Sequence, residues 1–177
     1  MKALEWLNKQ GGQQAAEIGD ATALLAHIEK YHPITDELKD YVASNLPIES
    51  LDLQVLRILS VDDIIDASDG FDEAGFLLSL GYVVIGDHDA GVILFNANDG
   101  SVHVLDVDAL DLSRAEQDEE SGEYFWDGES MEDVSDDFEM AFEECSSQFA
   151  SFEEFDTTLT GVLQGEISNE ELGIEDW

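Results

Sequence analysis

The chain has 177 residues, of which 44% are hydrophobic, so it is long enough for one globular domain with a substantial core. Its charge is strongly one-sided, because 43 Asp and Glu residues stand against six Lys and Arg residues, for a formal net charge of −37 at pH 7. Such a field repels phosphate backbones and anionic membranes, which argues against nucleic acid and membrane as partners. It favours a basic protein partner, although solubility, a salty cytoplasm and cation binding also explain such a charge.

The compartment is indicated by what the sequence lacks. Cys145 is the single cysteine, so the chain has no internal disulfide, which fits a reducing environment. The first ten residues contain Lys2 but no apolar segment of the kind found in signal peptides. No run approaches the length of a membrane span. We therefore expect a cytoplasmic protein.

Helical spacing of apolar residues predicts three helices in the first part of the chain. The first covers residues 2–9, and the second covers residues 20–31 with Asp20 as its N-cap. The third covers residues 35–45, with Thr35 as N-cap and two acidic residues at the positive end of the helix dipole. Its inward face is expected to carry Leu38, Tyr41 and Val42.

The next segment is less regular. Residues 51–59 resemble a strand, but their alternation of apolar and polar residues is imperfect. Ser60, followed three residues later by Asp63, resembles a capping box and predicts a short helix. Residues 71–80 are compatible with a helix or with the start of a sheet, and Gly81 ends that pattern.

Three apolar runs then predict a β-meander, at residues 82–85, 92–97 and 102–107. The turn at residues 98–100, Asn-Asp-Gly, is the clearest hairpin signal in the chain. Together with the flanking helices, the meander predicts an α+β fold with a central, mostly antiparallel sheet. By strand alternation, His103 is expected on the solvent side.

The turn Asp87-His88-Asp89 offers a metal site or an acid–base group as alternatives to simple turn capping. Turn capping is the favoured interpretation, because Gly91 falls one position early for a calcium loop and no Glu closes it. The four histidines show no metal-ligand spacing, so we expect no metal.

Two further groups have a chemical and a structural interpretation. Asp106 and Asp108 would share one face of a strand and could form an acid–base pair, although a solvated strand end is favoured. Cys145 lies in an apolar helical stripe beside acidic residues, which raise a thiol pKa, so we expect a buried, unreactive side chain.

Residues 116–144 form the most acidic segment, with fourteen acidic residues and no basic one. A short strand is predicted at 124–126, and the favoured interpretation is that it packs one or two of its aromatic rings on the core. Strand alternation would place Phe125 inward and Tyr124 and Trp126 outward, where aromatic rings surrounded by charge would anchor a protein partner. The apolar residues from 134 to 149 have helical spacing, with a strand as the alternative. The predicted partner-binding residues are Glu116, Asp118, Glu119, Glu120, Glu123, Tyr124, Trp126, Asp127, Glu129, Glu132 and Asp133.

The chain closes with a capped helix and an acidic end. Ser151 and Glu154 form a capping box that opens a helix ended by Gly165. Residues 166–177 are expected to be an acidic tail, in which Ser168 could start one more helical turn.

The order of these elements resembles the SUKH superfamily, which includes fungal cell-wall assembly regulators and bacterial immunity proteins paired with secreted toxins. The resemblance covers roughly residues 33–163 and depends mainly on the turn at 86–91, the DGSVHVLD strand and the SFEEF helix start. It implies three parts, namely an N-terminal helical extension (1–32), a SUKH-like α+β domain (33–165) and an acidic C-terminal tail (166–177). It also implies a protein-binding role and carries over no catalytic residue.

The main functional hypothesis is therefore an immunity-type protein that binds and neutralises a basic toxin domain, for example a nuclease, by blocking it with an acidic surface. The alternative is an intracellular regulatory or scaffold protein of the same fold without a toxin partner. An enzyme is not expected, because the sequence contains no nucleophile elbow, zincin, P-loop or dinucleotide-binding motif. No cofactor is expected.

Overall fold

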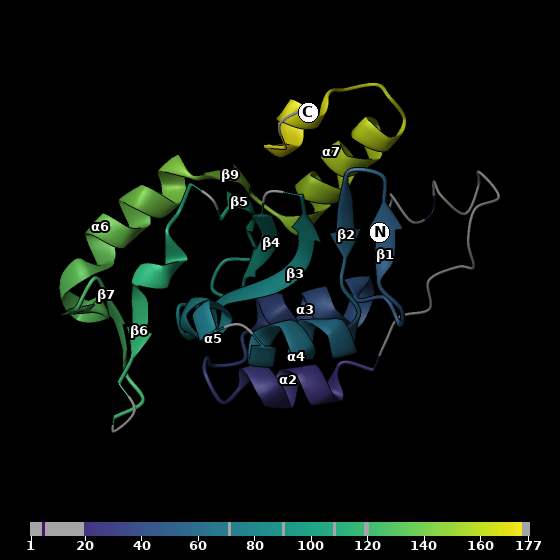
Figure 1. The fold of residues 1–177 in the computed structure, drawn as a ribbon. Helices are drawn as coiled ribbons and strands as arrows, with labels where there is room; N and C mark the ends of the chain where they lie inside the picture. The colour runs from purple at the N-terminus through teal and green to yellow at the C-terminus, as the bar shows by residue number, and fades with distance from the viewer. Residues whose placement is uncertain are drawn as a thin grey trace.

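The fold is α+β, as the sequence predicted, with six α-helices, one six-stranded sheet and one three-stranded sheet in the described part of the chain (Figure 1). The six-stranded sheet has the order β1-β2-β3-β4-β5-β9, and every neighbouring pair in it is antiparallel. The computed structural model describes residues 5, 20–70, 72–89, 91–107, 109–118 and 121–174, except for the side chains of residues 69–70, 72–74 and 131–137.

The first described helices lie within the ranges that the sequence predicted, but the predicted N-cap of the first is wrong. The N-cap of helix α2 (Thr22–Ile28) is Ala21, and the Asp20 carboxylate accepts a hydrogen bond from the Thr22 amide at 2.9 Å, just before the helix. Helix α3 (Asp36–Asn45) has Thr35 as its N-cap, with the side chain accepting from the Leu38 amide at 3.2 Å. A cap of this kind stabilises a helix by about 1 kcal/mol. The helix predicted at residues 2–9 falls outside the described residues, apart from Glu5.

The irregular segment that follows is a hairpin. Strands β1 (Leu51–Leu53) and β2 (Leu56–Ile58) pair around a tight turn, which explains the broken alternation. Helix α4 (Val61–Gly70) starts at Ser60, whose hydroxyl accepts from the Asp63 amide at 3.3 Å, as the capping signal predicted. Residues 71–80, compatible with helix or strand in the sequence, contain helix α5 (Asp72–Ser79).

The predicted meander is confirmed. Its strands are β3 (Tyr82–His88), β4 (Gly91–Asn96) and β5 (Val102–Asp106). Gly91 is required at the start of β4, because a Cβ atom there would lie 1.9 Å from the Leu105 carbonyl oxygen. The backbones of β4 and β5 therefore approach more closely than any side chain would allow.

The expectation that His103 faces solvent is wrong, because both faces of the meander are covered. His103 is only 5% exposed and its ring packs edge to face on Tyr82, with centroids 5.4 Å apart. Helix α6 (Met131–Glu144) covers this face and places Phe142 against both rings.

The opposite face of the sheet is covered by α3 and α7 (Phe152–Leu163). Tyr41 of α3 stacks on Phe95 of β4, with ring centroids 4.4 Å apart. Phe155 of α7 packs on Phe149 at the end of the sheet. With helices on both sides, the apolar runs of β3, β4 and β5 are buried almost continuously.

The acidic segment forms a small sheet of its own. It contains the predicted strand β7 (Tyr124–Trp126) and two strands that the sequence did not indicate, β6 (Ala115–Gln117) and β8 (Glu129–Ser130). A short 3₁₀ turn, η1 (Leu112–Arg114), leads into it. In Figure 1 this small sheet and α6 lie together at one side of the molecule, away from the β1–β2 hairpin.

The last elements return to the main sheet. Strand β9 (Ser146–Phe149) pairs with β5 at the sheet edge and was not predicted as a separate element. Ser151 caps α7 as predicted, accepting from the Glu154 amide at 3.2 Å. A 3₁₀ turn, η2 (Asn169–Leu172), follows and is capped by Ser168.

Both ends of the described chain contribute to the core. Helix α2 packs against α4 and buries Leu24 and Ile28, which belong to the stretch expected as an N-terminal extension. Leu172 and Ile174, from the stretch expected as a tail, are buried as well. Within the described residues, no helix is both long and apolar enough to cross a bilayer.

Candidate functional site

The acidic residues that the sequence singled out surround the small sheet β6–β8, called here the acidic sheet. Of the described ones, five have exposed side chains, namely Glu116, Asp118, Glu123, Asp127 and Glu129. Glu119 and Glu120 fall outside the described residues, and Glu132 and Asp133 lie in α6 with side chains that are not described. The structure therefore places an exposed carboxylate-rich surface on this sheet.

The aromatic residues of β7 have the opposite orientation to the one predicted. Trp126 is only 3% exposed, and its ring stacks on Phe76 of α5 at 5.7 Å and packs on Phe138 of α6 at 5.1 Å between centroids. Tyr124 also packs on Phe76, at 6.0 Å. Tyr124 and Trp126 therefore attach the acidic sheet to the body of the protein, and Trp126 presents almost no surface to a partner.

One end of the acidic sheet carries a compensated charge. The Arg114 guanidinium lies 5.1 Å from the centre of the Trp126 ring and donates to the Asp127 carboxylate. Arg114 holds the pKa of Asp127 below its usual range by this hydrogen bond and by its charge. Asp127 is thus already paired within the chain.

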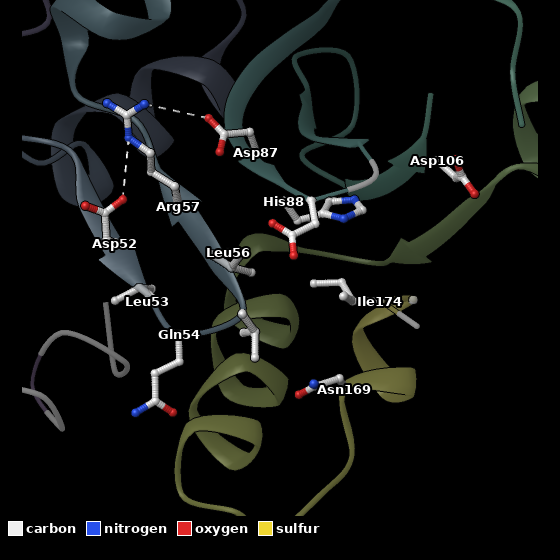
Figure 2. Close-up of a pocket in the computed structure, with 13 residues that line it drawn as sticks. Asp52, Leu53, Gln54, Leu56, Arg57, Asp87, His88, Asp106, Asn169 and Ile174 are labelled. Atoms are coloured by element: carbon white, nitrogen blue, oxygen red, sulfur yellow. Dashed lines mark ion pairs between the residues drawn. The ribbon is translucent and has the colours of Figure 1, made fainter. Parts of the chain in front are cut away.

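A second site was not predicted as such, namely a groove beside the β1–β2 hairpin (Figure 2), away from the acidic sheet (Figure 1). It lies between the β1–β2 hairpin, the β3–β4 turn and η2, and its volume is about 540 Å³. This volume is within the range of sites that hold small ligands or single side chains. Its lining combines apolar, acidic and basic groups, namely Asp52, Leu53, Gln54, Val55, Leu56, Arg57, Asp87, His88, Asp89, Asp106, Asn169, Gly173 and Ile174.

Strand register places one guanidinium between two carboxylates at the side of this groove. Arg57 of β2 lies directly opposite Asp52 of β1 and Asp87 of β3. Its Nε atom is 3.8 Å from Asp52 Oδ1, and its Nη1 atom is 4.0 Å from Asp87 Oδ2 (Figure 2). Opposite charges facing each other across paired strands stabilise a sheet by about 0.2–1 kcal/mol per pair.

A third carboxylate fixes the guanidinium from the start of α4. Asp63 Oδ2 is 3.1 Å from Arg57 Nη2 and also accepts from the Ser50 hydroxyl. The Ser60 amide donates in turn to Ser50 Oγ at 2.7 Å. These bonds lower the pKa of Asp63, mainly through Ser50, so its carboxylate stays charged and holds Arg57 in place.

Asp87 has the opposite behaviour. Burial raises the pKa of this carboxyl above its usual value, and the nearby carboxylates of Asp52 and Asp63 add to the effect. Arg57 and His88 act against the shift but do not cancel it. The groove thus holds a carboxylate whose negative charge is incompletely compensated.

His88 projects from the end of β3 at the groove (Figure 2). Both ring nitrogens are enclosed by the protein, and the Leu105 carbonyl lies close enough to interact with the ring. Burial lowers the pKa of His88 below its usual value. The Leu105 carbonyl and the carboxylates of Asp106, Asp89 and Asp87 favour the protonated ring, but less strongly. The imidazole is therefore neutral at pH 7 and can accept a hydrogen bond.

The chemical alternatives raised by the sequence find limited structural support. Asp106 caps the following turn by accepting from the Ala109 amide at 3.1 Å, and Asp108 falls outside the described residues. Cys145 is partly buried, and burial together with Asp106 and Glu144 raises its thiol pKa, which disfavours a nucleophilic thiolate. Among the described residues, no group of three His, Cys, Asp or Glu side chains is arranged to hold a metal ion.

The groove residues were only partly visible in the sequence. Asp87, His88, Asp89 and Asp106 were singled out, but as turn and strand-end residues, whereas Asp52 and Arg57 were not. A signal for this pair existed, because the two residues are equally distant from the turn at 54–55 and carry opposite charges. The contribution of η2 had no counterpart in the sequence pattern.

Comparison of the chain with protein families, with curated proteins and with solved structures gives no match. The charges and geometry described above are therefore the basis for assigning a function.

Proposed function

We propose that this chain is a binding protein of the immunity type, which neutralises a basic toxin domain by covering the positively charged surface that the toxin needs. A nuclease is the foremost candidate for the toxin. The observation that carries the proposal is the charge of −37, with 43 acidic against six basic residues. The resemblance of residues 33–163 to SUKH immunity proteins is a second support.

Ion pairs within the described part of the chain occupy several of its few cations and leave the net charge unchanged. Lys39 pairs with Asp36 at 2.9 Å, Arg57 lies among three carboxylates, and Arg114 pairs with Asp127. Half of the six basic residues are thus compensated locally. The remaining carboxylates dominate the field that an approaching molecule experiences.

The proposed mechanism is competition for a cationic surface. A nuclease holds the phosphate backbone with Lys and Arg side chains, and most of its non-specific affinity comes from these contacts. An exposed surface of carboxylates is attracted to the same side chains and excludes the nucleic acid while it is bound. The exposed carboxylates of the acidic sheet contribute to this attraction. No catalytic step is part of this proposal.

Co-expression with the toxin encoded by the neighbouring gene tests the proposal, with cell survival and the dissociation constant of the purified complex as readouts. We expect protection, and an affinity that falls steeply as salt rises. Neutralising three exposed carboxylates of the acidic sheet, with Glu116→Gln, Glu123→Gln and Glu129→Gln, should slow association. The matched control neutralises three exposed carboxylates on and beyond helices α2 and α3, with Glu29→Gln, Asp40→Asn and Glu49→Gln.

The outcomes separate the two functional hypotheses. Protection that is lost in the acidic-sheet variant and kept in the control supports blockade through this surface. A protein that protects against no adjacent toxin, or that lacks any toxin gene beside it, would instead favour the regulatory or scaffold protein.

A further inference from the structure

The groove between the β1–β2 hairpin, the β3–β4 turn and η2 has the lining that a long cationic side chain requires. Val55, Leu56 and Ile174 provide apolar surface, and Asp89 and Asp106 provide carboxylates on another side. Lysine and arginine have the same two-part character, because an aliphatic stem carries a charged head.

The charge of the groove remains unbalanced after its own cation is counted. Four carboxylates line it, and the single guanidinium, that of Arg57, is already held by Asp52, Asp63 and Asp87. Asp89 is exposed and takes part in no ion pair among the described residues. A second positive group would therefore meet carboxylates that Arg57 does not neutralise.

His88 lines the groove without adding a positive charge to it at neutral pH, because burial lowers the pKa of its ring. Its two ring nitrogens are enclosed by the protein and are not open to the groove. A cationic side chain would therefore meet no repulsion from His88, and the carboxylates of the groove would decide its binding.

We propose that this groove receives a lysine or arginine side chain of the basic partner protein and is the anchor of that interaction. The inference rests on the proposed function and moves its tightest contact to the groove, so that the acidic sheet attracts the toxin and the groove holds it. The exposed carboxylates elsewhere speed the encounter, whereas a side chain enclosed in the groove slows dissociation.

The first test uses a small probe and does not need the toxin. N-acetyl-arginine amide is titrated into the ¹⁵N-labelled full-length chain, and amide shifts are followed by NMR. We expect shifts at Leu56, His88 and Ile174, with a dissociation constant on the order of millimolar, which is typical of a single enclosed contact. The citrulline analogue has nearly the same shape without the charge, and it should leave these signals in place. Equal shifts from both probes, or no response at the groove, would overturn the proposal.

Two matched double variants locate the binding charge. Asp89→Asn with Asp106→Asn removes two groove carboxylates, and the amide oxygen of the second can still cap Ala109. Asp40→Asn with Asp66→Asn removes two exposed carboxylates on α3 and α4 and leaves the same net charge. We expect the arginine probe to bind about fivefold more weakly to the groove variant and unchanged to the control. If the probe binds equally weakly to both variants, the net negative charge of the protein explains its binding. That result would contradict an anchor in the groove.

The toxin and a free polyamine complete the test. If the groove variant dissociates from the toxin faster while association is unchanged, the anchor is supported. If it protects cells as well as the original chain does, the inference is wrong while the proposed function stands. If no toxin binds, the proposed function fails even where the arginine probe still occupies the groove. Spermidine that binds much more tightly than the arginine probe would assign the groove to a free polyamine instead of a protein side chain.

Discussion

Arg57 and Asp87 stand directly opposite each other on the paired strands β2 and β3, with Nη1 4.0 Å from Oδ2. The guanidinium lowers the pKa of Asp87, while burial and two neighbouring carboxylates raise it. We therefore expect Arg57→Gln to raise the pKa of Asp87 further. An NMR titration of the Asp87 carboxyl carbon measures the change, and Arg114→Gln, which removes a cation from the acidic sheet, is the control that should leave it unaltered.

Arg57→Gln should also lower the free energy of unfolding at neutral pH by about 1 kcal/mol or less, since Arg57 is 42% exposed and water screens its ion pairs. The loss should fade as the pH falls and first Asp87, whose pKa is raised, and then Asp63, whose pKa is lowered, become protonated. Protonated carboxyls neither attract Arg57 in the original protein nor repel one another in the variant. A loss that is equally large in acid would mean that Arg57 stabilises the sheet through packing and not through its charge.

A second prediction concerns His103, whose pKa burial lowers despite the nearby carboxylates of Asp99 and Glu143. The unfolded chain takes up this proton near pH 6.5 and the folded chain only at a lower pH. Between these values the unfolded state binds more protons, so stability is lost as the pH falls below about 6.5. His103→Gln keeps a polar group beside Ser101 and removes the titration, so the difference in unfolding free energy between the two proteins should shrink in acid.

At pH 7.5 we expect His103→Gln to cost about 1 kcal/mol, from the lost ring contacts with Tyr82 and Phe142. Denaturant unfolding at a series of pH values gives the comparison. Since both proteins carry the same acidic residues, the general charge repulsion cancels in the difference. A difference in unfolding free energy that does not depend on pH would mean that folding does not change the pKa of His103.

A third prediction is that Phe76 holds the acidic sheet against the body of the protein. Its ring meets Tyr124, Trp126 and Phe138, and it is fully buried. Phe76→Ala should cost about 3–5 kcal/mol, and Phe76→Leu less, because leucine keeps most of the volume. Both should shift the fluorescence of Trp126 in the folded protein.

The fluorescence measurement requires Trp6→Phe and Trp177→Phe, which leave Trp126 as the single tryptophan. Phe155→Leu is the matched control, since Phe155 is equally buried but packs on Phe149 and Phe152 at the other end of the sheet. It should lower stability without changing the native fluorescence. A change as large as that of Phe76→Leu would mean that the signal reports general loosening.

A fourth prediction compares two glycines. Gly91→Ala forces a Cβ atom to within 1.9 Å of the Leu105 carbonyl oxygen, so β4 and β5 must separate. Gly122→Ala meets nothing within 4 Å, but the residue has φ +75°. We expect the first to cost about 3 kcal/mol or more and the second about 1–2 kcal/mol. Thermal unfolding ranks the two, and equal costs would show that the strands adapt easily.

The sequence allowed good prediction where local chemistry decides the structure. Caps at Thr35 and Ser151 and the turn at 98–100 are short-range signals, and each lies where it was expected. Strands β6, β8 and β9 consist mostly of polar or small residues and become strands through their pairing partners, which no local pattern reveals.

The two errors of orientation have a common physical cause. Alternation indicates which residues share a face of a strand, but it does not indicate which face is covered. For His103 the runs of β3, β4 and β5 are apolar on both faces, which is the pattern of a sheet covered on both sides, and this pattern was available in the sequence. Strand β7 has only three residues, which is too short for a pattern that indicates its buried face. Its contact with Phe76 is what turns the Trp126 side chain toward the core.

The candidate groove was beyond sequence-based prediction for a different reason. Its acidic residues come from β1, β3, β5 and the β3–β4 turn, and its far wall comes from η2 and the residues after it. Their proximity depends on how the β1–β2 hairpin joins β3, a long-range contact. The residues were therefore recognisable one by one but not as a group.

Strand β9 is the one member of the large sheet that is not next in sequence to its neighbour, since the acidic sheet and α6 separate it from β5. Closing so long a connection costs chain entropy, and β9 lies at an edge of the sheet, where a strand has one pairing partner. Its departure would expose the edge of β5, which contains Val102, Val104 and Leu105, and such an edge pairs readily with another chain. Two copies of this protein would meet there with a charge of −37 each. The negative charge that is proposed to attract a toxin would thus also keep two copies of the protein from aggregating through the unpaired edge of β5.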